Sequence, residues 1–316
     1  MSSKIATPTS PAEAATTVAA TAATLAPYAS ADSLSVQPLR AGDEQEALAF
    51  LAARPLHTVV MAGHIRDNGL ESPLNRGQFH ACRDGQGRLE GIALIGHATL
   101  VETRTEAALA AFARLAQSSP RAHMIMGEDE RIERFWKYYA SEGELPRRVC
   151  RELLFEQRWP IEALEPVNGL RLATTADLVP VMVVQAHMAY LESGVNPLDE
   201  DPCGFRLRCE RRIEQGRVWV WVEDGRLIFK ADVISETPQV LYLEGIYVEP
   251  LRRNRGYGSR CMSQLSRKLL ARADALCVLV NERSPRACAF FEHAGFRLMS
   301  RYDTIFLERE RAVADC

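Results

Sequence analysis

The feature that most constrains this chain is an apolar strand followed by a basic, glycine-rich loop and a helix. Residues 241–249 read LYLEGIYVE, residues 252–259 read RRNRGYGS, and apolar residues at helical spacing continue to Leu270. At the start of a helix, backbone N–H groups have no partner within the helix, and the helix dipole adds partial positive charge. Glycines let an anion approach the backbone, and arginines add fixed positive charge. The pattern predicts a pyrophosphate site at the mouth of a sheet, built from Arg253, Arg255, Gly256 and Gly258.

Two common phosphate loops do not match this segment. A Walker loop needs G-x-x-x-x-G-K-[ST], and the required lysine is absent. A dinucleotide-binding fold needs G-x-G-x-x-G after its first strand, whereas this loop lies late in the chain and lacks the third glycine. What remains is Arg253-x-x-Gly256-x-Gly258, for which a glycine turn at a helix start with surface arginines is the plainer alternative.

A second pattern follows the loop and its helix. Residues 275–280 read ALCVLV, a short apolar run typical of a buried parallel strand. Asn281 comes next, and Ser284 suits the N-cap of a short helix that ends before Gly295 and Phe296.

Together the two segments resemble the signatures of the GNAT superfamily of acyl-CoA-dependent N-acyltransferases. The resemblance implies a mixed central sheet flanked by helices in residues 168–310, with acetyl-CoA as co-substrate. It implies that the coenzyme is held by Ile246, Tyr247, Val248, Arg253, Arg255, Gly256, Tyr257, Gly258, Ser259, Asn281 and Ser284.

Composition and charge argue against several other classes of protein. The net charge of -3 argues against a nucleic-acid partner held by phosphate contacts. The eight cysteines show no C-x-x-C and the seven histidines are scattered, so we expect no metal site and reduced thiols in a cytoplasmic protein. No stretch approaches ~18 consecutive apolar residues, so no membrane span is expected.

The chain divides into two α/β halves, each expected to be a GNAT-like domain with a mixed sheet flanked by helices. In the first, IMGEDERIERFWKYYASEG mirrors LVNERSPRACAFFEHAGF of the second in order and length. No glycine-rich loop precedes the helix expected at 105–117, so we expect this degenerate copy not to bind CoA but to close over its partner, mediate dimerisation or shape the substrate cleft. The predicted parts are a disordered lead-in (1–33), the first domain (34–158), a linker (159–167), the acetyltransferase domain (168–310) and a tail (311–316).

Hydrophobic patterning and capping residues predict the individual elements. Strands are expected at 34–39, 78–83, 89–95, 123–126, 151–155, 170–173, 218–222 and 227–233, besides the two already described. Helices are expected at 44–53, 105–117, 129–140, 174–191 and 204–215, with a loop at 192–201.

The resemblance places the general base of several GNAT enzymes at Glu244, within the strand that leads to the loop. A carboxylate there can take the proton of an ammonium group directly or through a water. The alternative is a structural pair with Lys230 on the next strand, where Lys230 and Asp232 share a face and could also pair together or touch substrate. Gly245 suits a bulge that opens the strand, so that backbone N–H groups near Ile246–Val248 would polarise the thioester carbonyl.

The acid that would protonate the leaving thiolate is not evident. Many GNAT enzymes carry a tyrosine four residues before the glycine of the Gly-Phe pair, and here that position is Phe291. On the acceptor side, Tyr190 and Glu192 are candidates to hold an amine by cation–π contact and charge, and a solvated loop is the alternative.

The sequence is therefore interpreted as an N-acetyltransferase that moves an acetyl group from acetyl-CoA to a primary amine by direct attack in a ternary complex. A non-catalytic acyl-CoA-binding regulator and a nucleotide-binding protein of another fold are the alternatives. A homodimer and a monomer whose two copies mimic a dimer are both left open.

Overall fold

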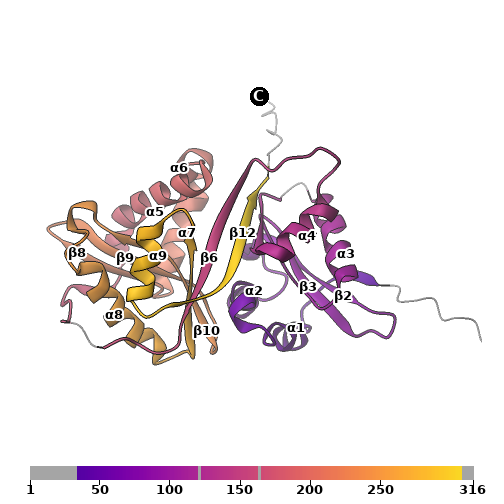
Figure 1. The fold of residues 1–316 in the computed structure, drawn as a ribbon, viewed down its shortest axis with the longest axis horizontal. Coiled ribbons are helices and arrows are strands. Elements are labelled where there is room, and N and C mark those ends of the chain that lie inside the picture. The colour runs from indigo at the N-terminus through magenta and orange to yellow at the C-terminus, as the bar shows by residue number, and fades with distance from the viewer. Residues whose placement is uncertain (1–33, 120–121, 163–164, 308–316) are drawn as a thin grey trace, which may run out of the picture. The chain divides into compact units, whose positions relative to one another are not determined.

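The computed structural model describes residues 34–119, 122–162 and 165–307. The predicted lead-in (1–33) and tail (311–316) lie outside these ranges. Within them, twelve strands form one mixed sheet (Figure 1). The strands are β1 (Ser35–Pro38), β2 (Gly77–Arg83), β3 (Leu89–Gly96), β4 (Ala98–Thr103), β5 (Met124–Glu128), β6 (Arg148–Gln157), β7 (Leu170–Leu172), β8 (Val218–Glu223), β9 (Arg226–Glu236), β10 (Val240–Val248), β11 (Ala275–Asn281) and β12 (Arg297–Phe306).

The order of the sheet is β1-β2-β3-β4-β5-β12-β6-β11-β10-β9-β8-β7. Two pairs are parallel, β4 with β5 and β10 with β11, and the other neighbours are antiparallel. Each parallel pair is joined by a helical crossover, as parallel strands require. The two halves of the chain thus repeat the same local arrangement, which confirms the predicted α/β architecture of tandem GNAT-like copies.

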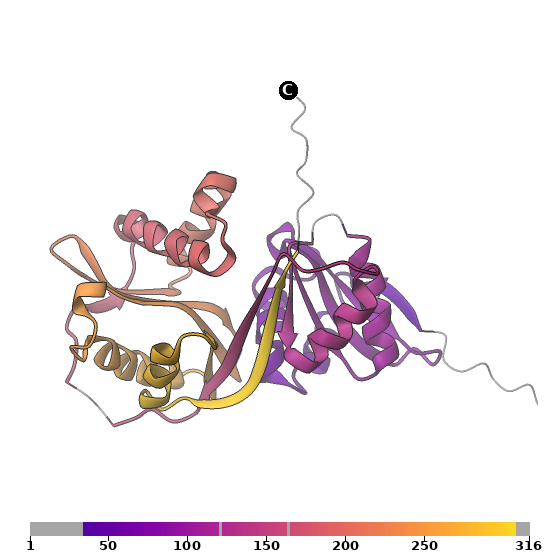
Figure 2. The ribbon, with the colours of Figure 1, turned by 45° about the horizontal axis from the view of Figure 1, so that its top comes forward.

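The last strand of each half pairs with the other half. β6 from the first half pairs with β11, β12 from the second half pairs with β5, and β6 and β12 pair with each other. Figures 1 and 2 show β6 and β12 running side by side. The sheet is therefore continuous across the predicted linker, and the domain boundaries at 158 and 168 stay a prediction.

The helices cover the sheet with the apolar residues that their spacing places on one face. α3 packs on strands of the first half and α4 on β5 and β12, whereas α8 packs on β9, β10 and β11, and α9 on β11. α2 starts in the first half but contacts β9 and β10 of the second. The α-helices are α1 (Glu44–Leu51), α2 (Pro55–Asn68), α3 (Glu106–Gln117), α4 (Asp129–Tyr139), α5 (Leu178–Ser193), α6 (Pro197–Glu200), α7 (Pro202–Glu214), α8 (Tyr257–Leu270) and α9 (Pro285–His293), with 3-10 turns η1 (Pro73–Asn75), η2 (Thr175–Asp177) and η3 (Pro250–Arg252).

The predicted elements are present, with ends shifted by a few residues. Four expectations were incomplete. Helix α2 and strands β4 and β12 were not predicted, and the expected loop at 192–201 contains the short helix α6. Within the described ranges, no helix combines the length and apolar character that crossing a bilayer requires.

Candidate functional site

The candidate site begins where β10 separates from β11. The two strands pair in parallel only from Val240 with Ala275 to Leu243 with Val278. From Glu244 onward, β10 pairs with no described strand on its β11 side, whereas β11 continues to pair with β6. At this point Gly245 has a φ of 61° and the register with β9 shifts, which confirms the predicted bulge. The bulge opens a gap between two central strands.

The helix that follows β10 starts without a side-chain cap. Its N-cap residue, Gly256, has a φ of 78°, a conformation that favours glycine, and a Cβ there would meet nothing within 4 Å. The first helical bond runs from the Arg260 N–H to the Gly256 carbonyl, at 3.0 Å. The three preceding N–H groups make no hydrogen bond with the described part of the chain. These groups, which belong to Tyr257, Gly258 and Ser259, form a site of the kind that binds phosphate.

Gly258 has a different role from the one expected. A Cβ at this position would lie 3.0 Å from Phe290 Cε2 and 3.1 Å from Val248 Cγ2. The missing side chain therefore lets the first turn of α8 pack closely against β10 and α9, and it is Gly256 that leaves space beside the backbone.

The two arginines of the predicted loop are both exposed and differ in their contacts. Arg253 Nε donates to the Val248 carbonyl at 2.9 Å, which ties the loop to the end of β10. Arg255 makes no ion pair or hydrogen bond with the residues that the structure describes. Its guanidinium is therefore free to meet an anion at the start of α8.

Glu244 is the first residue of β10 beyond the paired segment, and it is half-buried. Burial raises the pKa of its carboxyl above the ordinary value, because the charged form loses hydration. Arg212 and Lys230 act in the opposite direction, and Asp232 adds to the increase. A carboxyl with a raised pKa is better matched to proton transfer near neutral pH than an ordinary one.

Two further carboxylates interact with Glu244. Glu152 lies on β6 of the first half. Burial raises its pKa to about 7, and the charges of Glu244 and Asp303 add to the increase. The Thr304 hydroxyl, which donates to Glu152 at 2.8 Å, lowers the pKa. Burial and the charges of Glu244 and Glu152 raise the pKa of Glu192 to about 8, but its exposed position at the end of α5 lets water moderate the shift. Three carboxylates thus surround the opening.

Tyr242 lies among these carboxylates. Its side chain is 8% exposed, and its hydroxyl makes no hydrogen bond with the described residues. Burial and the charges of Glu244, Glu152 and Glu192 raise the pKa of this phenol, so it stays protonated. Sequence reasoning missed Tyr242, and it missed Glu152 because nothing in the sequence shows that β6 pairs with a strand of the second half.

Lys230 is buried behind the opening rather than exposed to substrate. Its Nζ lies 2.8 Å from Asp232 Oδ1 and donates to Gln185 Oε1 at 2.7 Å and to the Gly245 carbonyl at 3.2 Å. Arg212 pairs with the same aspartate at 3.0 Å. The sequence left open whether Lys230 pairs with Glu244, pairs with Asp232 or touches substrate. The structure shows the pair with Asp232, and we infer that Lys230 stabilises the bulge.

The remaining predicted residues lie around the opening. Asn281 ends β11, and its Oδ1 accepts the Arg283 N–H at 2.9 Å, whereas the Ser284 side chain does not cap α9. Tyr190 is 52% exposed on the last turns of α5. Phe291 is buried against Phe296, so this position carries no proton donor.

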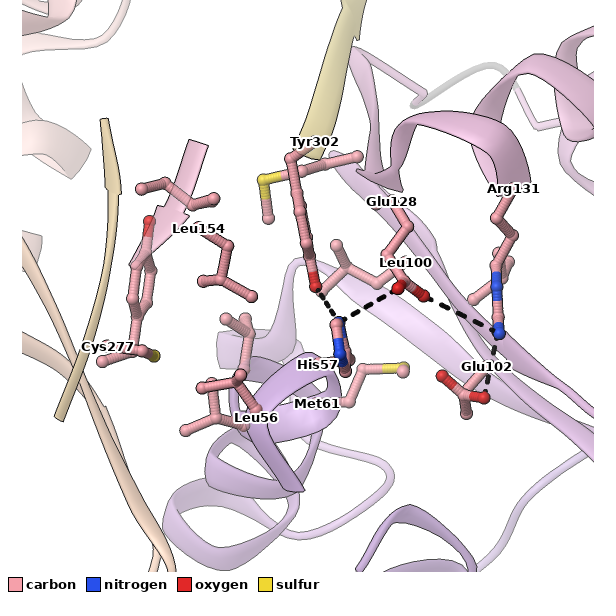
Figure 3. Close-up of a pocket in the computed structure, with 17 residues that line it drawn as sticks. Leu56, His57, Met61, Leu100, Glu102, Glu128, Arg131, Leu154, Cys277 and Tyr302 are labelled. Atoms are coloured by element: carbon pink, nitrogen blue, oxygen red, sulfur yellow. Dashed lines mark hydrogen bonds and ion pairs between the residues drawn. The ribbon is translucent and has the colours of Figure 1, made fainter. Parts of the chain in front are cut away.

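The first half has a similar opening, lined by charged side chains of this half and by Tyr302 of β12 (Figure 3). The β4–β5 ladder ends at Leu100 and Met126. Beyond it, Arg54 and Arg131 pair with Glu102 and Glu128, and His57 Nδ1 lies 2.9 Å from the Tyr302 hydroxyl and 3.5 Å from Glu128 Oε1. A small cavity of about 40 Å³ lies beside this network, and Arg54, Glu102, Glu128 and Arg131 also line a wider, open pocket of about 770 Å³.

The helix that follows β4 also differs from α8 at its start. The Thr105 side chain accepts the Ala108 N–H at 3.3 Å, so the protein itself caps this end of α3. The cap distinguishes the start of α3 from that of α8, and the expectation that the first half does not hold the coenzyme stays a prediction. In the described ranges no group of His, Cys, Asp and Glu residues is placed to hold a metal ion.

Solved structures share this fold. A Drosophila protein has 12% sequence identity and a TM-score of 0.61, covering 87% of this chain and 98% of its own. A tandem GNAT protein from the clavulanic acid biosynthesis pathway has 15% identity and a TM-score of 0.55, covering 86% and 98%. An acetyltransferase of the GNAT family from Colwellia psychrerythraea has 11% identity and a TM-score of 0.50, covering 87% and 100%. Such low identity shows the fold alone, which is that of a tandem GNAT protein.

Part of the sequence also matches a protein-family model. Residues 183–296 match the model of the acetyltransferase (GNAT) family. This segment of the second half is a GNAT-family domain, and it contains the opening of β10, the start of α8 and Asn281. Members of this family are acetyltransferases, which supports a transferase activity. No curated protein sequence is significantly similar to this chain.

Proposed function

We propose that the second half transfers an acetyl group from acetyl-CoA to a primary amine by direct attack in a ternary complex. The observation that carries the proposal is the opening of β10 from β11, which has Glu244 at one end and the uncapped start of α8 beyond the other. An extended thioester fits such an opening, with its diphosphate at the helix start. Binding there uses the free N–H groups of Tyr257, Gly258 and Ser259 and the charge of Arg255.

The strand itself supplies the polarising groups. The Glu249 N–H donates to the Ile228 carbonyl on β9, so by strand alternation Tyr247 also faces β9, and Ile246 and Val248 face the gap. Backbone N–H groups directed into the gap can donate to a thioester carbonyl oxygen, and such fixed donors are typically worth ~2.7–4 kcal/mol of barrier.

Glu244 takes one proton from the substrate ammonium and leaves a neutral amine, which attacks the thioester carbon. As the C–N bond forms and the C–S bond breaks, the nitrogen gives up a second proton to water, and coenzyme A leaves as a thiolate that takes up a proton from water. Water has this role because Phe291 has no proton to give. No covalent bond to the protein forms in this route.

The acceptor is held on the side of α5. Glu152 and Glu192 attract a cationic amine, and the Tyr242 hydroxyl and the Tyr190 ring offer it a hydrogen-bond acceptor and an aromatic face. The proposed acceptor substrate is therefore a small molecule or a peptide with an ammonium group. We place the reaction in the cytoplasm, where acyl-CoA is available. The seven described cysteines are all free thiols in the structure, which suits a reducing compartment.

A second candidate is an acyl-CoA-binding regulator without turnover. It is favoured by one observation, the burial of Phe291 at the position that many GNAT enzymes give to tyrosine. A regulator would bind acetyl-CoA with the same groups but would not release thiol.

Thiol release from acetyl-, propionyl- and succinyl-CoA across a panel of primary amines tests the proposal. We expect amine-dependent release that Glu244→Gln reduces strongly. Binding of acetyl-CoA without release for any amine would favour the regulator, and binding of ATP but not acetyl-CoA would rule out both.

A further inference from the structure

The peptide at the bulge of β10 is held by a buried ammonium group. Lys230 is fully buried, and its Nζ donates to the carbonyl of Gly245 at 3.2 Å. A Cβ at Gly245 would lie 2.6 Å from the same nitrogen, so the lysine packs directly against the bulge. Isolated charges are costly to bury, and this one persists because Asp232 and Gln185 also contact it.

This contact determines where the next N–H group points. In a trans peptide the carbonyl and the following N–H point in opposite directions. Lys230 therefore holds the Gly245 carbonyl on its own side and turns the Ile246 N–H away from itself. Because Tyr247 and Glu249 face β9, the Ile246 N–H faces the gap between β10 and β11.

We propose that Lys230 is a positioning residue for acyl transfer, which fixes the Ile246 N–H as a donor to the thioester carbonyl. This inference rests on the proposed function, and it adds a role that lies outside the coenzyme loop. A glycine bulge alone is flexible, since glycine loses more conformational freedom on folding than any other residue. The buried ammonium supplies the restraint that glycine lacks.

The same group influences the general base. Charged groups face the Glu244 carboxyl from four elements: Arg212 of α7, Asp232 and Lys230 of β9, Glu152 of β6 and Glu192 of α5. Removal of the lysine charge takes away one of the two cations that favour the ionised carboxylate. The pH at which Glu244 loses its proton should then rise.

The principal test is Lys230→Met, which removes the ammonium but keeps a long apolar side chain. Asp232 retains Arg212 as its partner in this variant. We expect kcat to fall about 10- to 100-fold, the effect of a donor about 1 Å out of place, with the KM for acetyl-CoA within about twofold of the wild-type value. The acidic limb of the pH–rate profile should move to higher pH. Lys137→Met, at an exposed lysine of α4, is the matched control.

Gly245→Ala tests the same contact from the other side and leaves the charged groups intact. It should lower kcat with little change in KM, and the double variant should lose no more than the more impaired single variant, because both changes disturb one peptide. This variant also carries the test if Lys230→Met does not fold. Unchanged kcat in a folded Lys230→Met or Gly245→Ala protein would overturn the proposal.

A binding measurement separates this inference from the proposed function. If the Ile246 N–H meets the acyl carbonyl, wild-type protein binds acetyl-CoA more tightly than CoA, and Lys230→Met loses that preference in calorimetry. An undiminished preference in Lys230→Met would contradict the inference even without turnover. Absence of thiol release by the wild type, with the preference present and lost on mutation, would contradict only the proposed function.

Discussion

Gly63 of α2 lies directly against Ser235 of β9, and a Cβ on the glycine would be 1.8 Å from the serine Oγ. The same hydroxyl donates to the Val59 carbonyl of α2 at 2.7 Å. A helix from the first half therefore rests on a strand of the second half with only the serine side chain between them. This contact joins the two halves besides the exchange of β6 and β12.

Gly63→Ala should destabilise the folded protein even though alanine favours helices. Helix propensity gains about 1 kcal/mol, but the overlap with Ser235 forces α2 away from β9 and costs about 1–3 kcal/mol or more. Urea denaturation should show a net loss. Gly63→Ala combined with Ser235→Ala should lose less than the sum of the single changes, and strict additivity would contradict the contact.

Glu244→Gln should lower kcat by about 10²- to 10⁴-fold with little effect on acetyl-CoA binding. In the wild type the rate should rise with pH as the Glu244 carboxyl loses its proton. Because the pKa of Glu244 is raised, this limb of the pH–rate profile should lie at a higher pH than it would for an ordinary glutamate. The variant should lack that limb. Glu236→Gln on β9 is the control, and an identical pH–rate profile in an active Glu244→Gln preparation would exclude this residue as the base.

Glu152→Gln should stabilise the protein at alkaline pH and not at acid pH. The pKa of Glu152 is raised to about 7 in the folded protein, from 4.5. Between these values the folded state binds more protons than the unfolded chain, so stability decreases as pH rises through this window. The glutamine lacks this penalty, and because the half-buried site is partly screened we expect a gain of about 1–2 kcal/mol at pH ~8. Denaturation at pH ~4 and pH ~8 measures the difference, and a larger gain at the lower pH would contradict it.

Arg255→Ala should weaken acetyl-CoA binding about 3- to 10-fold and reduce its dependence on ionic strength, because an exposed charge that meets phosphate is screened by salt. The matched control is Arg114→Ala. Arg114 is also exposed, but it lies on α3, the helix of the first half that corresponds to α8, and we expect no change in acetyl-CoA binding. Equal affinities for all three proteins would exclude Arg255 from the coenzyme site.

Much of the second half could be predicted because its chemistry is local. The strand, the loop and the helix start are contiguous in sequence, and Gly245 and Gly256 mark backbone conformations that only nearby residues determine. Helix α2 was missed for a physical reason. It is covered by both halves, so apolar and small residues occur around its circumference and no amphipathic period appears.

The contribution of the first half to the site could not be predicted. The apolar alternation of β6 identifies a strand but does not name its neighbours, and only the pairing with β11 brings Glu152 next to Glu244. The Lys230–Gly245 contact also depends on tertiary structure, because the bulge changes which backbone group faces the lysine.

The most direct measurement of the central claim is calorimetric titration of acetyl-CoA into Ser259→Glu and Ala107→Glu. Each change adds a carboxylate to the first turn of a helix, α8 or α3, where negative charge is favourable for the helix itself. We predict that Ser259→Glu folds normally and binds acetyl-CoA at least about tenfold more weakly, a loss of ~1.4 kcal/mol, while Ala107→Glu binds like the wild type. Wild-type affinity in Ser259→Glu, or a loss confined to Ala107→Glu, would contradict the assignment of the coenzyme to the start of α8.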